Sequence, residues 1–119
     1  MAARAVALGA FGAHGLRSRV DAQALETWQT AAHYHLVHAF ALVMVGYACA
    51  LTPSPRLSLA GWFFLTGQLI FGGTLYVLVL TGAKWLGAIT PLGGVCLIVG
   101  WLALASTALS TKGRGEAEA

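Results

Sequence analysis

The sequence has few charged side chains, and they are unevenly distributed. Only 9% of its 119 residues are Asp, Glu, Lys or Arg, whereas soluble domains carry about 25%. No charged side chain occurs in residues 57–83 or 85–111, and Lys84 alone separates these two runs. Each run is longer than the roughly 20 apolar residues that cross a bilayer as a helix. A water-soluble domain of this size is therefore excluded, and the sequence predicts an integral membrane protein.

Acidic side chains are absent from the apolar segments, and this absence limits the chemistry available there. Asp21 and Glu26 lie in a polar connection, and Glu116 and Glu118 lie near the C-terminus. A carboxylate-driven ion pump and two-carboxylate hydrolysis are thus disfavoured. The sequence also lacks a phosphate-binding loop, a G-x-S-x-G motif and an H-E-x-x-H motif. We predict that the chain is not an enzyme and has no catalytic residues.

Cysteine is scarce, and the basic residues form no cluster. Cys49 and Cys96 lie inside apolar segments without a C-x-x-C motif, so we interpret them as packing residues and predict no metal site. The seven basic residues lie mostly at the ends of apolar runs. This placement is typical of side chains that reach lipid head groups, and not of nucleic-acid binding. The expected partner is the lipid bilayer.

The apolar segments predict an all-α transmembrane bundle of four helices, at residues 5–16, 31–52, 57–82 and 85–110. The first would reach only about 18 Å at 1.5 Å per residue, so we expect either a half-helix or a helix that begins upstream of Met1. Because the link before Lys84 is very short, the last two helices are expected to form a tight antiparallel hairpin. The predicted domain covers residues 1–111, followed by a disordered polar tail at residues 112–119.

Four local features complete the expected fold. Pro53 and Pro55 end the second helix, because proline lacks a helix donor and restricts the preceding residue. In the polar connection, Asp21 is expected to cap a helix that begins at residue 22. Trp28 is expected in the aromatic belt at the membrane interface. In the last segment, Pro91 after Thr90 predicts a kink.

Histidines are the main polar side chains within the apolar segments. His33, His35 and His38 lie at the start of the second segment, and His14 lies near the end of the first. On a helix His38 shares a face with His35 and with Tyr34. Three hypotheses stay open for this group: structural hydrogen bonds to carbonyls or head groups, a proton-handling or polar-substrate site, and metal or haem ligation.

Gln68 is the only carboxamide deep in the third segment, where an interhelical hydrogen bond is its plainest role. The candidate polar or ligand site therefore consists of His14, Tyr34, His38 and Gln68. Several glycines are expected to let helices approach closely, although the double glycines could instead open a small cavity. They are Gly9, Gly12, Gly72, Gly73, Gly93 and Gly94.

Four strings in order carry a resemblance: ALGAFGAHGL (residues 7–16), HYHLVHAFAL (33–42), FGGTLYVLVLTG (71–82) and WLGAITPLGG (85–94). Together they resemble a family of small four-helix membrane proteins of unknown function from bacterial inner membranes, whose eukaryotic relatives are called transmembrane protein 256. The resemblance implies an inner-membrane or organellar location and supplies no established activity. It points to His14, Tyr34, His38 and the Thr90-Pro91 pair, ranks His33 and His35 lower, and implies further apolar residues before the first string.

The predicted function is that of a small accessory or structural subunit, which packs against a larger membrane complex or self-associates. The alternative is a small ligand-binding or transport module for a proton, a metal, haem or a lipid-like ligand. No cofactor is assigned. A count of basic residues weakly favours termini in the cytoplasm. Four basic residues are expected on the side of the termini: Arg4, Arg56, Lys112 and Arg114. Three are expected on the opposite side: Arg17, Arg19 and Lys84.

Overall fold

The computed structural model describes residues 1–118 and is built of helices. They are α1 (Ala2–Phe11), which continues as a π-helical turn η1 (Gly12–Leu16), then α2 (Ala22–Leu51), α3 (Pro55–Thr81) and α4 (Leu86–Glu118). The predicted all-α fold with four helices is confirmed. The three helices α2, α3 and α4 are long and apolar enough to cross a membrane, and α1 is not among them.

The helix ends follow from local sequence. The Oδ1 atom of Asp21 accepts a hydrogen bond from the backbone N–H of Ala24 at 2.7 Å, which confirms the predicted cap of α2. Pro55 is the first residue of α3. Proline is tolerated there because a backbone N–H at this position would have no hydrogen-bond partner within the helix. Gly82 adopts a left-handed φ of 70° and its N–H donates to the carbonyl of Leu78 at 2.7 Å. This turn sets up the tight α3–α4 hairpin.

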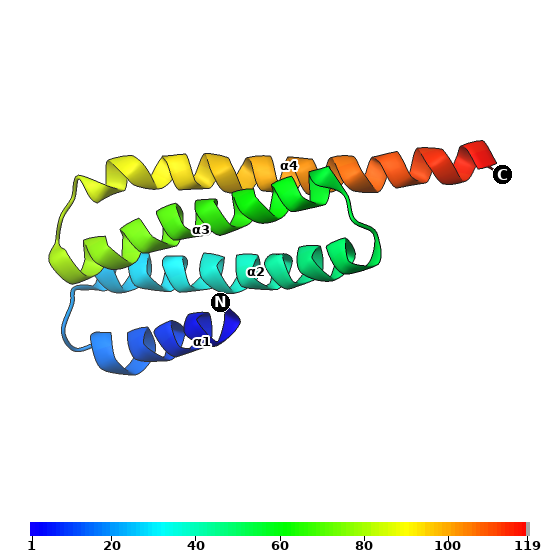
Figure 1. Cartoon of the computed structure of the whole chain (residues 1–119). Helices are drawn as coiled ribbons and strands as arrows, with labels where there is room; N and C mark the ends of the chain where they lie inside the picture. Colours follow the sequence, from blue (N-terminus) through cyan, green and yellow to red (C-terminus); the bar gives the residue numbers. More distant parts are fainter. Residues whose placement is uncertain (119) are drawn as a thin grey trace.

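The three long helices lie side by side with α3 in the middle, and α1 packs against α2 (Figure 1). The molecule measures 60 × 26 × 17 Å, so it is elongated and flat. Helices α3 and α4 approach each other most closely at Gly93, where an added Cβ would overlap the backbone of Phe71 and lie 2.8 Å from the carbonyl oxygen of Gly67. A central cluster of Ala41, Val45, Phe64 and Leu97 joins the three long helices.

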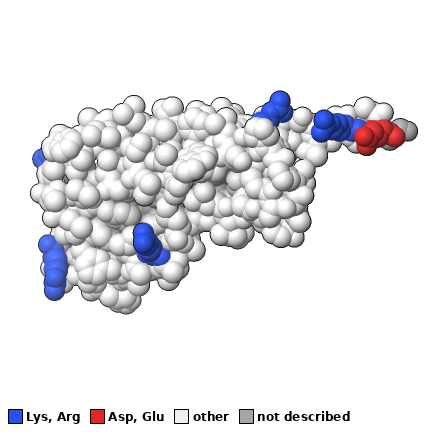
Figure 2. Space-filling view, viewed as in Figure 1, with Lys and Arg blue, Asp and Glu red and all other residues white. Residues whose placement is uncertain are grey.

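Charged side chains are nearly absent from the visible face of the bundle. Figure 2 shows basic groups mainly toward its ends and acidic groups on the projecting C-terminal end of α4. The exposed side chains of the long helices are instead large and apolar, including Phe40, Tyr47, Trp62 and Leu102. Such a surface matches lipid rather than water.

Trp28 differs from its predicted place at the membrane interface. It is only 2% exposed, lies between the rings of Phe11 and Tyr76, and donates from Nε1 to the carbonyl of Leu8 at 2.7 Å. An added Cβ at Gly12 would overlap the indole, so the absence of a side chain at this position lets the ring pack against α1. The indole binds α1 to α2 instead of anchoring the chain at the head groups.

The end of α4 also differs from expectation. The structure continues α4 through Lys112 to Glu118, where a disordered tail was predicted, and Ala119 lies outside the described residues. Lys112 and Glu116 lie one helical turn apart with 4.0 Å between Nζ and Oε1, a pairing that supports a helix modestly. The same helix runs through Pro91, where Thr90 donates to the carbonyl of Leu86 at 3.1 Å.

Candidate ligand pocket between α1, α2 and α3

The first group of predicted site residues surrounds His38 in α2. Its side chain is 4% exposed, its Nδ1 lies 2.8 Å from the carbonyl oxygen of Tyr34, and its Nε2 lies 3.1 Å from Nε1 of Trp101 in α4. An indole N–H can only donate, so Nε2 must accept and Nδ1–H must donate to the carbonyl. The ring also packs on Phe64 of α3. We call His38, Tyr34, Phe64 and Trp101 the His38 cluster.

Both ring nitrogens of His38 are therefore engaged in hydrogen bonds. The cluster ties α2 to α4 across α3, which agrees with the structural hypothesis for the histidines. A metal or haem iron would have to displace the Trp101 indole to reach Nε2. Within residues 1–118, no three His, Cys, Asp or Glu side chains converge where they could hold a metal ion.

The four predicted site residues do not form one site. His14 is exposed in η1, near the start of α2. Since α1 runs antiparallel to α2 and Gly12 lies against Trp28, His38 is about 15 Å or more from His14 along the α2 axis. Tyr34 does stack on His38, with ring centroids 6.0 Å apart. Gln68 lines a separate pocket.

That pocket lies where α3 faces both α1 and α2. It has a volume of about 190 Å³, and we call it the His35 pocket. The N-terminal end of the chain and the first turns of α1 contribute three residues, α2 contributes one histidine and α3 contributes the other four. The lining residues are Met1, Arg4, Leu8, His35, Gln68, Leu69, Gly73 and Tyr76.

Two polar atoms of this pocket lack hydrogen-bond partners. They are Nε2 of His35 and Oε1 of Gln68, the only such buried side-chain atoms in the described part of the chain. Both residues are more than nine-tenths buried, with 7% and 3% exposure. Buried polar groups in native proteins are nearly always paired. Both unpaired atoms belong to residues that line this one small pocket, although the atoms themselves have almost no accessible area.

The protonation of His35 follows from its neighbour. The Nδ1 atom of His35 lies 3.4 Å from the hydroxyl oxygen of Tyr76. If the hydroxyl donates to Nδ1, the tyrosine hydrogen is paired and only the Nε2–H of the neutral ring remains unpaired. The opposite arrangement would leave both the tyrosine hydrogen and Nε2 without partners. The first arrangement leaves fewer groups unpaired, so the unpaired group on His35 is a donor and the one on Gln68 is an acceptor.

Two adjacent glycines shape the α3 wall. An added Cβ at Gly72 would overlap the carboxamide nitrogen of Gln68, so this glycine lets the side chain fold along the helix. An added Cβ at Gly73 would meet nothing within 4 Å, so this position leaves the pocket open. Close helix approach and a small cavity were the two roles considered for this glycine pair. Neither glycine meets a neighbouring helix, Gly73 faces open space, and Gly72 gives room to the Gln68 side chain.

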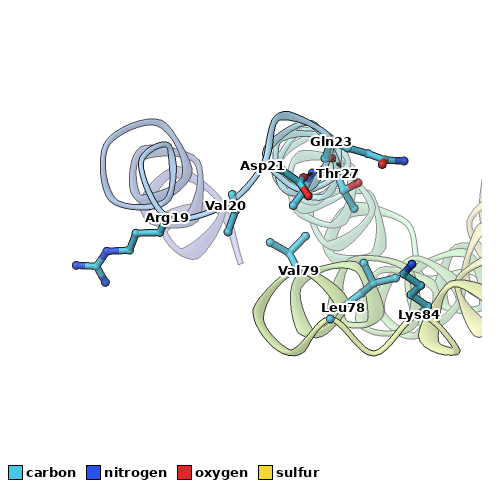
Figure 3. Close-up of a pocket in the computed structure, with 10 residues that line it drawn as sticks. Arg19, Val20, Asp21, Gln23, Thr27, Leu78, Val79 and Lys84 are labelled. Carbon is cyan, nitrogen blue, oxygen red and sulfur yellow. Dashed lines mark hydrogen bonds between the residues drawn. The ribbon is translucent and has the colours of Figure 1, made fainter.

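A larger hollow lies at the nearby end of the bundle, between the α1–α2 connection, the start of α2 and the end of α3. It measures about 690 Å³, and Figure 3 shows its lining residues. Arg19 points away from this hollow, and Asp21 caps α2. Its charged and carboxamide side chains are exposed, and none of its polar atoms is among the buried ones without a partner, so the smaller His35 pocket is the stronger candidate site.

Sequence patterns did not predict His35, Tyr76 and Arg4 as members of a site. A signal for His35 was available, because the buried stripe of α2 contains Trp28 and Ala32, and continuing it by one turn reaches His35. The pairing with Tyr76 had no such signal, since helical periodicity does not say which neighbouring helix a face will meet.

The location of Arg4 changes the count of basic residues on which the predicted membrane orientation depends. That count placed Arg4 with Arg56, but Arg4 lines the His35 pocket beside the middle part of α2, where Figure 1 also shows the N-terminus. Three basic residues then remain at each end of the bundle, and cytoplasmic termini stay a prediction without support from charge.

Comparisons with known proteins agree with this architecture. A family model described as "Protein of unknown function (DUF423)" matches residues 8–94. A UPF0382 membrane protein of Staphylococcus aureus is 45% identical over 100 residues, which cover 84% of this chain and 81% of the relative. YwdK of Bacillus subtilis, also named a UPF0382 membrane protein, is 42% identical over 106 residues, covering 88% and 86%. No solved structure matches the chain. The resemblance to a small bacterial membrane-protein family of unknown function is confirmed.

Proposed function

This chain belongs to the DUF423 family of membrane proteins of unknown function, and we propose that it is a small binding module within the membrane. In this proposal the His35 pocket takes up a polar part of the ligand. The supporting observation is the pair of unpartnered atoms on His35 and Gln68. Each unpaired buried group costs about 1–3 kcal/mol, and a ligand that supplies both partners would remove that cost.

The proposed location is the inner membrane of a bacterium. The relatives described above are membrane proteins of bacteria, and the three long apolar helices are long enough to cross a bilayer. No catalytic role is proposed, because the lining of the pocket includes no Ser, Cys or Lys nucleophile and no carboxylate beside its one histidine.

Gentle detergent extraction followed by native mass spectrometry tests the binding function. We expect the wild-type protein to retain a bound small molecule or lipid in a fixed ratio. The variants His35→Phe and Gln68→Leu should lose it, because each removes one of the two unpaired polar groups and keeps a side chain of similar size.

His33→Phe is the matched control. His33 lies two residues from His35 on the exposed side of α2, so its replacement should leave the bound species in place. Identical spectra for wild type, His35→Phe and Gln68→Leu would overturn the binding function. Because Gln68→Leu replaces an unpaired carboxamide with an apolar side chain, it should fold even if His35→Phe does not.

A second candidate is the accessory subunit that the sequence analysis favoured. An apolar groove of about 290 Å³ lies between α2 and α3, with Gly46 and Gly61 among its lining residues. Small residues allow close approach between membrane helices, and an added Cβ at Gly46 would meet nothing within the chain. A partner helix or a second copy of this chain is the occupant that fits such a groove.

A native gel of extracted complexes tests this candidate. Gly46→Leu should reduce the size of the complex if a helix occupies the groove, and Gly113→Leu, at an exposed glycine near the C-terminal end of α4, should not. An unchanged size with Gly46→Leu would count against an accessory role through this surface.

A further inference from the structure

The chemistry of the His35 pocket narrows the class of its ligand, provided that the pocket binds a ligand as proposed above. Its size comes first. About 190 Å³ corresponds to roughly six water molecules at about 30 Å³ each. This space takes a phosphate with a few attached atoms but not an acyl chain. A lipid ligand would therefore place its head group inside and its chains outside, against the lipid-exposed Leu69 at the pocket wall, which is 60% exposed.

The charge of the pocket is positive. Arg4 is the one charged side chain among the lining residues, and no carboxylate joins it there. A cation held against apolar helices is costly unless an anion accompanies it. The nearby end of the bundle also carries Arg17, Arg19 and Lys84 on its connections, and such basic residues concentrate anionic lipids near the surface.

The two unpaired groups need hydrogen-bond partners of different kinds. The Nε2–H of His35 needs an acceptor, and Oε1 of Gln68 needs a donor. A phosphate oxygen would accept from His35 and pair with Arg4, and a hydroxyl on the same head group would donate to Gln68. A carboxylate or a phosphate diester whose head group has no O–H or N–H would leave Gln68 unpaired, and an ammonium head group would place a second cation beside Arg4.

The shallow end of the pocket lies within reach of a head group. The exposed side chains of α2 are polar from Gln23 as far as His33 and become apolar from Leu36 onward. His35 therefore lies at the boundary between the two parts. On α3 the pocket extends from Tyr76, about 8 Å from the helix end at Thr81, to Gln68, about 20 Å from that end and midway along the helix. A head group must therefore enter below the membrane interface to reach Gln68.

We infer that the His35 pocket binds the head group of a phospholipid that carries both a negative phosphate and a free hydroxyl. Arg4 and His35 bind the phosphate oxygens, Gln68 accepts from the hydroxyl, and Gly73 leaves the opening through which the glycerol backbone and its chains pass into the bilayer.

The contributions of the phosphate and the hydroxyl can be separated with four lipids that have identical acyl chains. Each lipid is titrated into delipidated protein, and native mass spectrometry measures the bound fraction. Phosphatidylglycerol has the phosphate and hydroxyls, phosphatidylmethanol has the phosphate alone, diacylglycerol has a hydroxyl alone, and phosphatidylcholine has neither a net charge nor a hydroxyl. We expect phosphatidylglycerol to bind most tightly and phosphatidylmethanol about tenfold more weakly, as for the loss of one buried hydrogen bond. The other two should bind more weakly still.

Variants connect these differences to the pocket. Arg4→Gln should weaken phosphatidylglycerol at least about tenfold and leave diacylglycerol unchanged. Arg17→Gln, at a basic residue outside the pocket, should change neither. Gln68→Leu should abolish the preference for phosphatidylglycerol over phosphatidylmethanol while the preference for anionic lipids remains.

Three results would overturn the assignment in distinguishable ways. Equal binding of all four lipids, still lost in His35→Phe, would reject the head-group chemistry and keep the pocket as a binding site. Soluble glycerol 3-phosphate that competes as well as the lipid would reject a membrane ligand in favour of a water-soluble phosphate. No lipid or phosphate binding at all, with wild type and His35→Phe alike, would reject both this assignment and the proposed function.

Discussion

His35 and His38 lie one turn apart on the buried face of α2, yet their surroundings differ in one decisive respect. His38 uses both ring nitrogens, one toward the Tyr34 carbonyl and one toward the Trp101 indole. His35 has one long contact to Tyr76 and a second nitrogen without a partner. Both side chains are more than nine-tenths buried. Burial therefore does not separate a structural histidine from a candidate binding group, whereas the completeness of its hydrogen bonds does.

The same contrast extends to the helices around each residue. On the α4 side of α3, Gly93 is in contact with the Phe71 backbone and no space remains. On the α1 side of α3, Gly73 faces open space beside Gln68. One face of α3 thus holds the bundle together, and the other leaves room for a ligand.

The largest expected effect tests this difference between the faces of α3. Gly93→Ala should lower the free energy of unfolding by about 3 kcal/mol, because the added methyl group overlaps the α3 backbone, which cannot move aside. Gly73→Ala, its counterpart on the open face, should change the value by less than about 1 kcal/mol. Unfolding in mixed micelles measures both, and equal losses would contradict the comparison.

The second effect compares the two histidines directly. His38→Leu should destabilise the protein by about 2 kcal/mol, because it leaves the N–H of Trp101, on the apolar surface of the bundle, without an acceptor where lipid offers none. In ligand-free protein His35→Leu should be neutral or stabilising, because it removes a group that is already unpaired. A greater loss from His35→Leu than from His38→Leu in the same unfolding assay would show that the roles are reversed.

A smaller effect is expected at Gly72, where binding and stability should separate. Gly72→Ala forces the Gln68 carboxamide to move, and this flexible end can do so with a stability change below about 1 kcal/mol. Phosphatidylglycerol binding should nevertheless fall about tenfold, because the acceptor leaves its position. Gly94→Ala, whose added Cβ would make only an ordinary 3.9 Å contact with Phe71, serves as the control. Unchanged lipid binding in Gly72→Ala would remove Gln68 from the site.

The smallest effect concerns Tyr76. Tyr76→Phe keeps the ring that packs on Trp28 and removes the hydroxyl that selects the protonation of His35. Because that contact is long, we expect lipid binding to weaken only about threefold. Tyr34→Phe should leave binding unchanged, since Tyr34 contributes its backbone carbonyl to His38. An equal response of both variants in the lipid titration would mean that the hydroxyl of Tyr76 has no special role.

Much of the fold could be predicted because its signals are local. The Asp21 cap, the Pro53 and Pro55 break and the short link at Gly82 each depend on neighbouring residues alone. The site could not be predicted in the same way. In a helix such as α3, apolar residues surround the whole circumference, so periodicity does not show which side meets α1 and which meets lipid. Trp28 illustrates this, because an interfacial tryptophan and one buried against Gly12 look alike in sequence.

Nitrogen-15 NMR of the protein labelled at histidine, recorded with and without phosphatidylglycerol, tests the central contrast most directly. The structure predicts that His38 carries its proton on Nδ1 and His35 on Nε2, and that only the His35 signals move as lipid is added. Signals of His38 that move with those of His35, or His35 signals that stay fixed at saturating lipid, would contradict the assignment of one histidine to the scaffold and the other to the ligand.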